Sequence, residues 1–191
     1  MGFTDRFREA AEAARAKLAE HGVLNDAAAI HGINGVGPTD TDHQVARRAI
    51  GRGAPDPYSL VTHDEVVALT GIPVGPPSLT YADDDLGVRF DAEDGHRRAW
   101  SFGIHAGHAV DDDTLFDPVS WYEWMVALLD KPEPVPDLGD AAVYEQGLLY
   151  VRGQGHAFYI LVDAPEGSPA QLWATTLARR VLDRLATGEA G

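Results

Sequence analysis

Residues 148–162 have the sequence LLYVRGQGHAFYILV, and this stretch decides the fold. It contains two strand-like runs, Leu148–Arg152 and Ala157–Asp163, on either side of a turn that includes Gly155 and His156. Apolar runs that flank a short glycine-containing turn predict an antiparallel β-hairpin. A third run, Ala141–Glu145, precedes the pair. We therefore expect three antiparallel strands over residues 141–163.

The same order of elements occurs earlier in the chain. Three further strand-like runs are Ser78–Ala82, Gly87–Asp91 and Arg97–His105, and the tight-turn sequence Asp94-Gly95 lies between the last two. A capping-box sequence stands before each set of three, as Thr62–Glu65 and Ser120–Glu123, and predicts the start of a helix. The matching order favours a duplicated αβββ unit, over 58–113 and 117–165. Identity between the two units is low, so a chance match stays open.

The segments outside these units complete the predicted architecture. Residues 168–187 begin with a capping-box sequence, Ser168–Gln171, and continue with an apolar helical face. Near the other end, residues 3–21 have a narrow, alanine-rich apolar stripe that predicts an amphipathic helix. We expect a helical arm over 1–22, a Gly/Pro-rich connector over 23–57 and a domain over 58–191. The fold class is α+β, with helices packed on a largely antiparallel sheet.

The composition excludes several classes of function. Lys and Arg number 15 against 30 Asp and Glu in 191 residues, so the formal net charge is −15. A chain this acidic repels nucleic-acid phosphates and anionic membrane surfaces. The chain has no Cys, which excludes disulfides, thiolate catalysis and cysteine zinc sites. Its apolar runs are too short to span a bilayer, and its first residues do not resemble a secretory signal, so we expect a cytoplasmic protein.

Histidines and nearby carboxylates are the first candidates for chemistry. His105 and His108 are followed by Asp111, and imidazole nitrogens together with a carboxylate are suitable ligands for a divalent metal. Because residues 105 and 108 would point to opposite sides of a strand, they converge only if the chain turns at Gly107. The alternative is a solvated strand end and an acidic loop. We recognise no cofactor motif elsewhere, since the glycine-rich stretch 32–37 lacks the strand and the Gly-Lys-Ser/Thr ending of a phosphate loop.

Aromatic residues are the second group of candidates. Three of them crowd the second predicted helix, and two lie on a predicted strand; these partner- or ligand-binding candidates are Trp100, Phe102, Trp121, Tyr122 and Trp124. Packing in the core is the simpler explanation, because most large aromatic side chains serve cores. If a pocket exists, we expect the second helix to face the strand with Trp100 and Phe102 across it.

Three stretches of the chain resemble a known family. Residues 136–144 read PDLGDAAVY, residues 147–153 read GLLYVRG and residues 156–162 read HAFYILV. They are similar to small actinobacterial envelope lipoproteins of the PsbP-like class, although this chain has no Cys to carry the lipid. The resemblance implies a non-catalytic binding scaffold. In shape and charge the chain also looks like secretion chaperones, and its repeated units look like those of vicinal-oxygen-chelate metalloenzymes.

These observations lead to two hypotheses about function. The first is a non-enzymatic interaction or chaperone-like protein that binds a basic protein or peptide through an acidic face, alone or as a homodimer. The acidic residues support it, because 16 of them and only 4 basic residues lie between Asp83 and Glu145. The second is an enzyme that acts on a small molecule or depends on a divalent metal, with His105, His108 and Asp111 as ligands.

Overall fold

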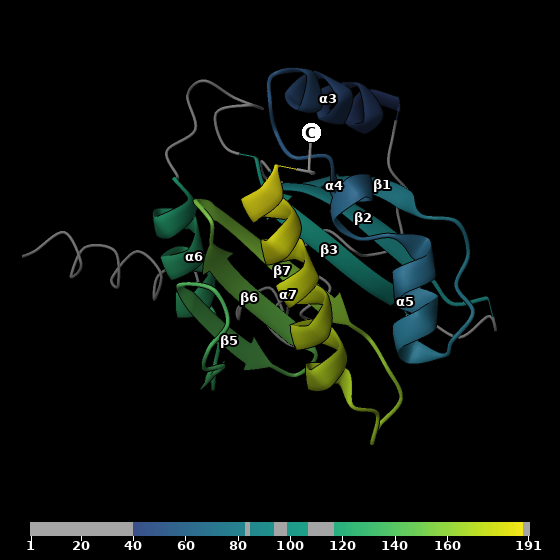
Figure 1. Cartoon of the computed structure of the whole chain (residues 1–191), viewed down its shortest axis with the longest axis vertical. Helices are drawn as coiled ribbons and strands as arrows, with labels where there is room; N and C mark the ends of the chain where they lie inside the picture. The colour runs from purple at the N-terminus through teal and green to yellow at the C-terminus, as the bar shows by residue number, and fades with distance from the viewer. Residues whose placement is uncertain (1–39, 83–84, 94–98, 107–116, 189–191) are drawn as a thin grey trace, which may run out of the picture.

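A seven-stranded antiparallel sheet carries the fold, in the order β1-β2-β3-β7-β6-β5-β4 (Figure 1). The structure is a computed structural model, and it describes residues 40–82, 85–93, 99–106 and 117–188. The strands are β1 (Ser78–Ala82), β2 (Asp85–Asp91), β3 (Ala99–His105), β4 (Glu133–Pro134), β5 (Ala141–Glu145), β6 (Leu148–Gly153) and β7 (His156–Val162). The helices are α3 (Asp40–Gly51), α4 (Pro57–Leu60), α5 (His63–Thr70), α6 (Pro118–Ala127) and α7 (Ala170–Thr187). The predicted α+β class is confirmed.

The predicted hairpin of β6 and β7 is confirmed. Strands β6 and β7 pair from Leu148 opposite Leu161 to Gly153 opposite His156. The two residues between them, Gln154 and Gly155, have φ values of 54° and 75°. A two-residue turn with positive φ at both positions matches the twist of the strands that it joins, so the turn sets the register of this pair.

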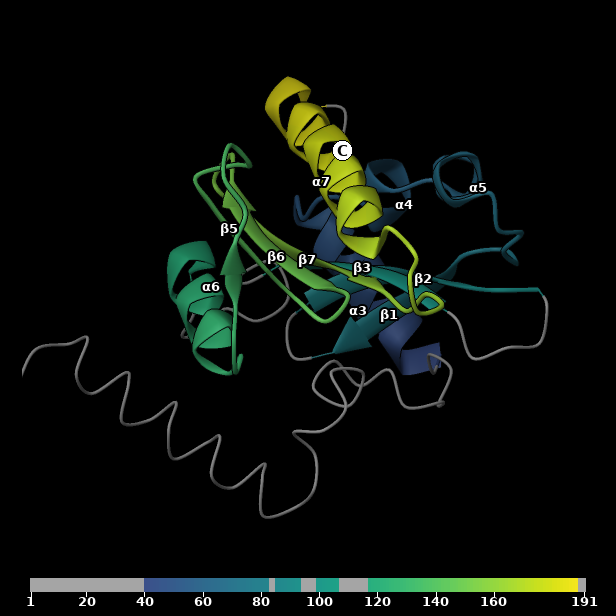
Figure 2. The ribbon, with the colours of Figure 1, turned by 90° about the horizontal axis from the view of Figure 1, so that it is seen from below.

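The helices cover the two faces of the sheet unequally. Figure 2 shows α4, α5 and α7 on one side of the sheet and α6 on the other. We call these sides the α7 face and the α6 face. Side chains of a strand alternate between the faces, so Phe158 and Ile160 of β7 belong to the α7 core, whereas Tyr159 and Leu161 belong to the α6 core. Two separate hydrophobic cores result.

Only one of the three predicted capping boxes is confirmed. Thr62 accepts a hydrogen bond from the Glu65 N–H, and Glu65 accepts one from the Thr62 N–H, at the start of α5. The prediction at Ser120 is wrong, because α6 begins earlier, with Asp117 accepting bonds from two backbone N–H groups and Pro118 in the first turn. The prediction at Ser168 is also wrong, because α7 begins at Ala170 without a side-chain cap. Asp followed by Pro starts a helix at least as well as Ser does.

The predicted duplication is compatible with the strand order but not with the placement of the helices. Strands β1, β2, β3 and β5, β6, β7 are arranged symmetrically about the antiparallel β3–β7 pair. A twofold axis between these two strands would run perpendicular to the sheet and leave equivalent helices on one face. Instead, α5 packs on the α7 face and α6 packs on the opposite face. The duplication stays a prediction.

The described segments change the picture of the flanking regions. The connector predicted over 23–57 contains α3, which packs against the edge strand β1 and buries Ala46 and Ala49. The described end of this segment therefore belongs to the folded domain. The predicted arm over 1–22, the Asp94-Gly95 turn and the rest of the connector lie outside the described residues. In the part of the chain that the structure describes, no helix is both long and apolar enough to cross a membrane.

Candidate functional site

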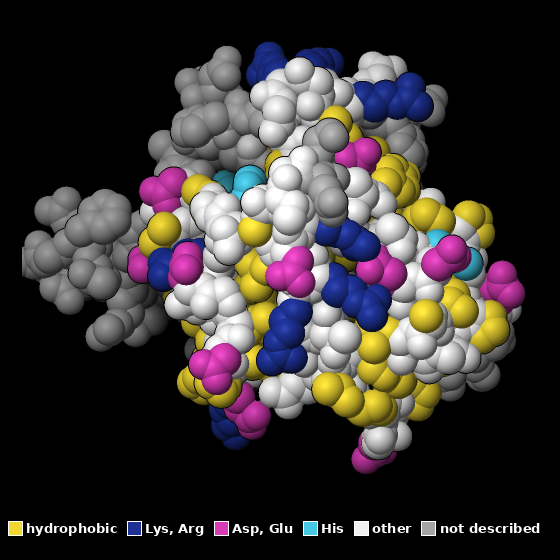
Figure 3. All heavy atoms as spheres, in the orientation of Figure 1, with side chains coloured by type: hydrophobic (Ala, Val, Ile, Leu, Met, Phe, Trp, Pro, Cys, Tyr) yellow, Lys and Arg dark blue, Asp and Glu magenta, His cyan; other side chains and the backbone are white. Residues whose placement is uncertain are grey.

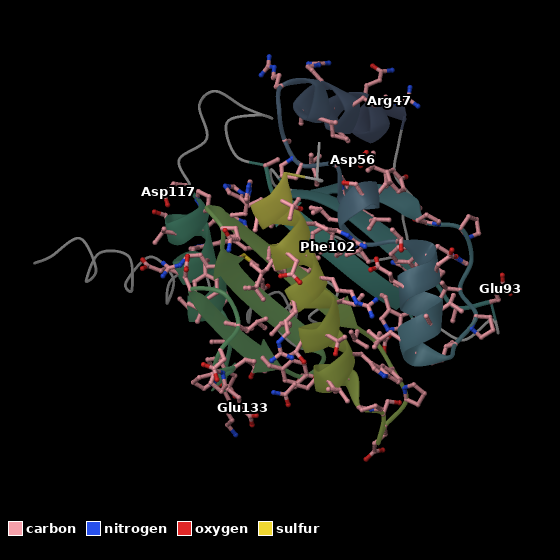
Figure 4. All side chains as sticks on the ribbon, in the orientation of Figure 1. Arg47, Asp56, Glu93, Phe102, Asp117 and Glu133 are labelled. Atoms are coloured by element: carbon pink, nitrogen blue, oxygen red, sulfur yellow. The ribbon has the colours of Figure 1, made fainter. Side chains whose placement is uncertain are left out.

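The strand β3 separates the sequence-predicted site residues onto two faces. Trp100 and Phe102 are buried in the core of the α7 face, whereas Trp121 and Tyr122 are buried in the core of the α6 face. Figure 4 labels Phe102 on β3, behind α7. The expectation that the second helix faces Trp100 and Phe102 is therefore wrong. Those two residues occupy alternate positions on β3, and the contact of α6 with this strand is made by His105 on the other face.

A buried histidine–aspartate pair lies on the α6 face instead. The register places Asp85 at the start of β2 directly opposite His105 at the end of β3. The His105 Nδ1 is 3.3 Å from the Asp85 Oδ1, and their side chains are 2% and 11% exposed. Because a buried charge or polar ring needs a partner, the two side chains hold each other in place. This contact fixes the orientation of the His105 ring.

The Trp121 ring of α6 packs against the His105 member of this pair. It stacks on the His105 ring, with centroids 5.5 Å apart and an interplanar angle of 20°. Its edge-to-face contact with Tyr150 of β6 has a centroid distance of 5.9 Å. Trp121 thus contacts both β3 and β6, and β7 lies between them in the sheet. We call Asp85, His105, Trp121, Tyr150 and Tyr159 the α6-face cluster.

The two tyrosines of the α6-face cluster contact each other, and one of them lies against a glycine of β3. Tyr150 and Tyr159 meet edge to face at 6.2 Å, and burial raises the pKa of both hydroxyls, so both stay neutral at physiological pH. Gly103 lies opposite Tyr159, and a Cβ at this position would collide with the Tyr159 ring. A glycine is therefore required where the ring crosses β3.

The structure does not assemble a metal site from the described residues. Within the four described ranges, no group of three or more His, Cys, Asp or Glu residues could hold a metal ion. The His105 Nδ1 is already in contact with Asp85, and these two side chains alone are too few to hold a metal ion. His108 and Asp111, the other two predicted ligands, lie outside the described residues. The metal hypothesis therefore stays a prediction.

The other notable feature is an acidic edge beside α6. Between 117 and 145 the chain has seven acidic residues and one basic residue, Lys131. Among the exposed ones, Asp117 caps α6, and four others form no ion pair with another described residue: Glu123 on α6, Glu133 on β4, and Asp137 and Asp140 before β5. We call these four residues the acidic edge. Arginines gather instead over α7, in the centre of Figure 3.

The remaining aromatic candidates lie near this edge. Tyr122 is buried under the Arg152 guanidinium, whose carbon is 5.7 Å from the ring centroid. Trp124 is half-buried and packs against the α6-face core. Figure 4 labels Asp117 at the start of α6 and Glu133 on β4, which mark the two ends of this side of the molecule. Of the five predicted aromatics, only Trp124 therefore combines partial exposure with a place beside the acidic edge.

Sequence reasoning missed Asp85. The predicted strand began at Gly87, whereas β2 begins at Asp85 and brings this carboxylate into register with His105. Three successive aspartates at 83–85 obscured the signal, because acidic runs usually indicate solvated loops. Only the pairing of β2 with β3 shows that Asp85 is buried.

Comparisons with family models, with curated proteins and with solved structures found no match for this chain. The resemblance to PsbP-like lipoproteins therefore stays a prediction that these comparisons do not test.

Proposed function

We propose that this chain is a cytoplasmic, non-catalytic interaction protein that binds a basic segment of a partner protein along the acidic edge. The observation that carries the proposal is the set of exposed carboxylates at Glu123, Glu133, Asp137 and Asp140, none of which has an ion-pair partner among the described residues. A cationic segment of a partner would pair with such exposed carboxylates, and complementary charge would speed its association. The protein would act alone or as a homodimer.

The edges of the sheet support binding through side chains rather than through strand addition. At one edge β4 has only two residues, Glu133 and Pro134, and proline has no N–H to donate to an added strand. At the other edge α3 packs against β1. Both edges are therefore protected in the way that disfavours pairing with another chain. A partner would therefore bind to exposed side chains, such as the carboxylates, rather than to backbone groups of an edge strand.

A charge-reversal experiment tests the proposal. The probe is a fluorescein-labelled 12-residue peptide of alternating Lys, Arg and Ser, and binding is measured by anisotropy at low and at physiological salt. The triple variant Glu133→Lys, Asp137→Lys, Asp140→Lys is expected to bind more than about tenfold more weakly, because each lost charge pair contributes up to roughly 1 kcal/mol.

A matched control keeps the same net charge. It carries Asp64→Lys, Glu93→Lys and Glu166→Lys, three exposed positions outside residues 117–145. If the control loses as much affinity as the acidic-edge variant, the interaction depends only on total charge, and the proposed site is wrong. Size-exclusion chromatography with light scattering on the same proteins determines whether the chain is a monomer or a dimer.

One observation favours the alternative, a metal-dependent enzyme. In many metal sites, one nitrogen of the ligating histidine is hydrogen-bonded to a carboxylate, which orients the ring so that the other nitrogen can bind the metal. Asp85 contacts the His105 Nδ1 in this way. Elemental analysis of untagged protein tests it. The alternative predicts about one equivalent of a divalent metal, which is lost in His105→Ala and in His108→Ala together with a chelator-sensitive melting temperature. Metal-free protein whose melting temperature is unaffected by chelator would contradict this alternative.

A further inference from the structure

We infer that the buried Asp85–His105 pair is a latch that holds α6 on the sheet, so that α6 opens as a separate unit when the pair is broken. The inference concerns a conformational device, and neither the acidic edge nor any ligand is needed for it. It rests on how α6 is attached, which differs from the attachment of every other long described helix.

Helix α6 is held by few neighbouring elements among the described residues. The helix has ten residues, and a helix of that length is marginal without tertiary contacts. It packs mainly on β6 and β7, and no other described helix contributes a buried side chain to the α6-face core. Its buried side chains are Trp121, Tyr122 and Met125, followed by Leu128 just past its end. Among the described residues, the contacts that support α6 are therefore mainly one row with the sheet.

Within that row, Trp121 contacts both β6 and β3. Tyr150 meets the ring edge-on from β6, and His105 covers one of its flat faces from β3. The remaining aromatic contacts of the α6-face cluster, between Tyr150 and Tyr159, stay within the sheet. The stack on His105 is therefore the ring contact that connects α6 to the half of the sheet formed by β1, β2 and β3.

The stack of Trp121 on His105 depends on Asp85. An imidazole can rotate about its bonds to the backbone, and it stacks on Trp121 in only one of those orientations. The contact of the His105 Nδ1 with the Asp85 carboxylate selects that orientation. Asp85 is thus a positioning residue, which acts on α6 through His105. Removal of either partner also leaves a buried polar group without its present partner, and this disfavours the closed arrangement further.

Opening has a consequence for the acidic edge, and this consequence alone rests on the proposed function. Glu123 is on α6, whereas Glu133, Asp137 and Asp140 follow it on the β4–β5 segment. When α6 leaves the sheet, the four carboxylates no longer form one edge. A partner that binds all four would favour the closed state, because binding to one of two states shifts the population toward it.

Hydrogen–deuterium exchange of the full chain, followed by mass spectrometry, tests the latch. In the unmodified protein, amides of residues 121–127 are expected to exchange faster than those of β7 and α7. In Asp85→Leu, which has no hydrogen-bonding atom to offer His105, and in His105→Ala, their exchange should accelerate by about tenfold or more, while amides of α7 change by less than about twofold. The matched control is His156→Gln, a half-buried histidine on β7 for which no such stack exists among the described residues, and it should leave α6 unchanged.

The outcomes separate a latch from a general loss of stability. Unchanged exchange of residues 121–127 in both variants would overturn the inference. An equal acceleration in α6 and α7 would overturn it as well, because α6 would then open only with the whole domain. If His105→Ala does not fold, Asp85→Leu, which has a similar size but cannot hydrogen-bond to His105, decides the result alone. The peptide-binding experiment is independent, so the latch can hold while the acidic-edge proposal fails.

Discussion

On one face of the sheet α7 is anchored by an apolar core and an ion pair, whereas on the other face α6 is anchored by an aromatic row that ends on a polar pair. Ala174, Leu177, Ala178 and Val181 of α7 are buried in the α7-face core. Its Arg184 donates hydrogen bonds to both oxygens of Glu65 and to the Leu60 carbonyl, which ties α7 to α4 and α5. Both helices bury apolar side chains, but we expect α6 to open from the sheet more readily than α7. Among the described residues, α7 packs on β6 and β7 and also contacts α4 and α5, whereas α6 packs mainly on β6 and β7.

The largest expected effects come from truncating one buried side chain in each helix. Leu177→Ala in α7 and Met125→Ala in α6 each remove a side chain that is almost fully buried, and each should cost about 2–5 kcal/mol where the helix is docked. We expect Leu177→Ala to lower the global free energy of unfolding in urea by most of this amount. Met125→Ala should lower it less and should instead speed the exchange of α6 amides. Equal losses of global stability would show that the two faces unfold together.

The next effect concerns the close approach of Tyr159 to β3. Gly103→Ala should destabilise the domain by about 1–3 kcal/mol, because the added methyl group collides with the Tyr159 ring and displaces it from Tyr150. Near-ultraviolet circular dichroism should lose part of its aromatic signal. The control is Gly51→Ala at the end of α3, where a Cβ would meet no described atom within 4 Å. A similar loss at both positions would mean that the ring contact is not responsible.

The smallest effect concerns the ion pair of the α7 face, and it depends on pH. Burial by itself raises the pKa of Glu65, but hydrogen bonds from Arg184 and Thr62 outweigh it and hold the pKa below its ordinary value. Glu65→Gln should therefore cost about 1–2 kcal/mol at pH 7. A carboxylate with a lowered pKa stabilises the fold above its unfolded pKa of about 4.3, and this contribution is lost as the pH falls through the folded pKa.

The pH dependence provides the control for that variant. The difference in unfolding free energy between the unmodified protein and Glu65→Gln should be largest near neutral pH and should shrink in acid. Chemical denaturation at pH 7 and at pH 3 measures it. A difference that stays constant with pH would indicate that Glu65 acts through packing rather than through its charge. Exchange of α6 amides should not respond to this variant, since Glu65 lies on the opposite face.

Much of the fold could be predicted because its signals are local. The β6–β7 hairpin follows from two apolar runs and a turn that tolerates positive φ at Gln154 and Gly155. The capping box at Thr62 and Glu65 is likewise a contact between residues three positions apart. The start of α6 was misplaced because two cap sequences compete there, and Asp117 with Pro118 prevails over Ser120. The candidate site was predicted only in part, through His105 and Trp121.

The sequence by itself determined the antiparallel strands, the acidic character and the presence of aromatic residues in α6. Only the tertiary structure decided that Trp121 stacks on His105, that Trp100 and Phe102 point away from it, and that Asp85 completes the pair. The physical reason is the period of two along a strand, because a strand shows which residues share a face but not which helix covers that face. That choice depends on how segments far apart in the chain pack together, and it placed α6 and α7 on separate cores.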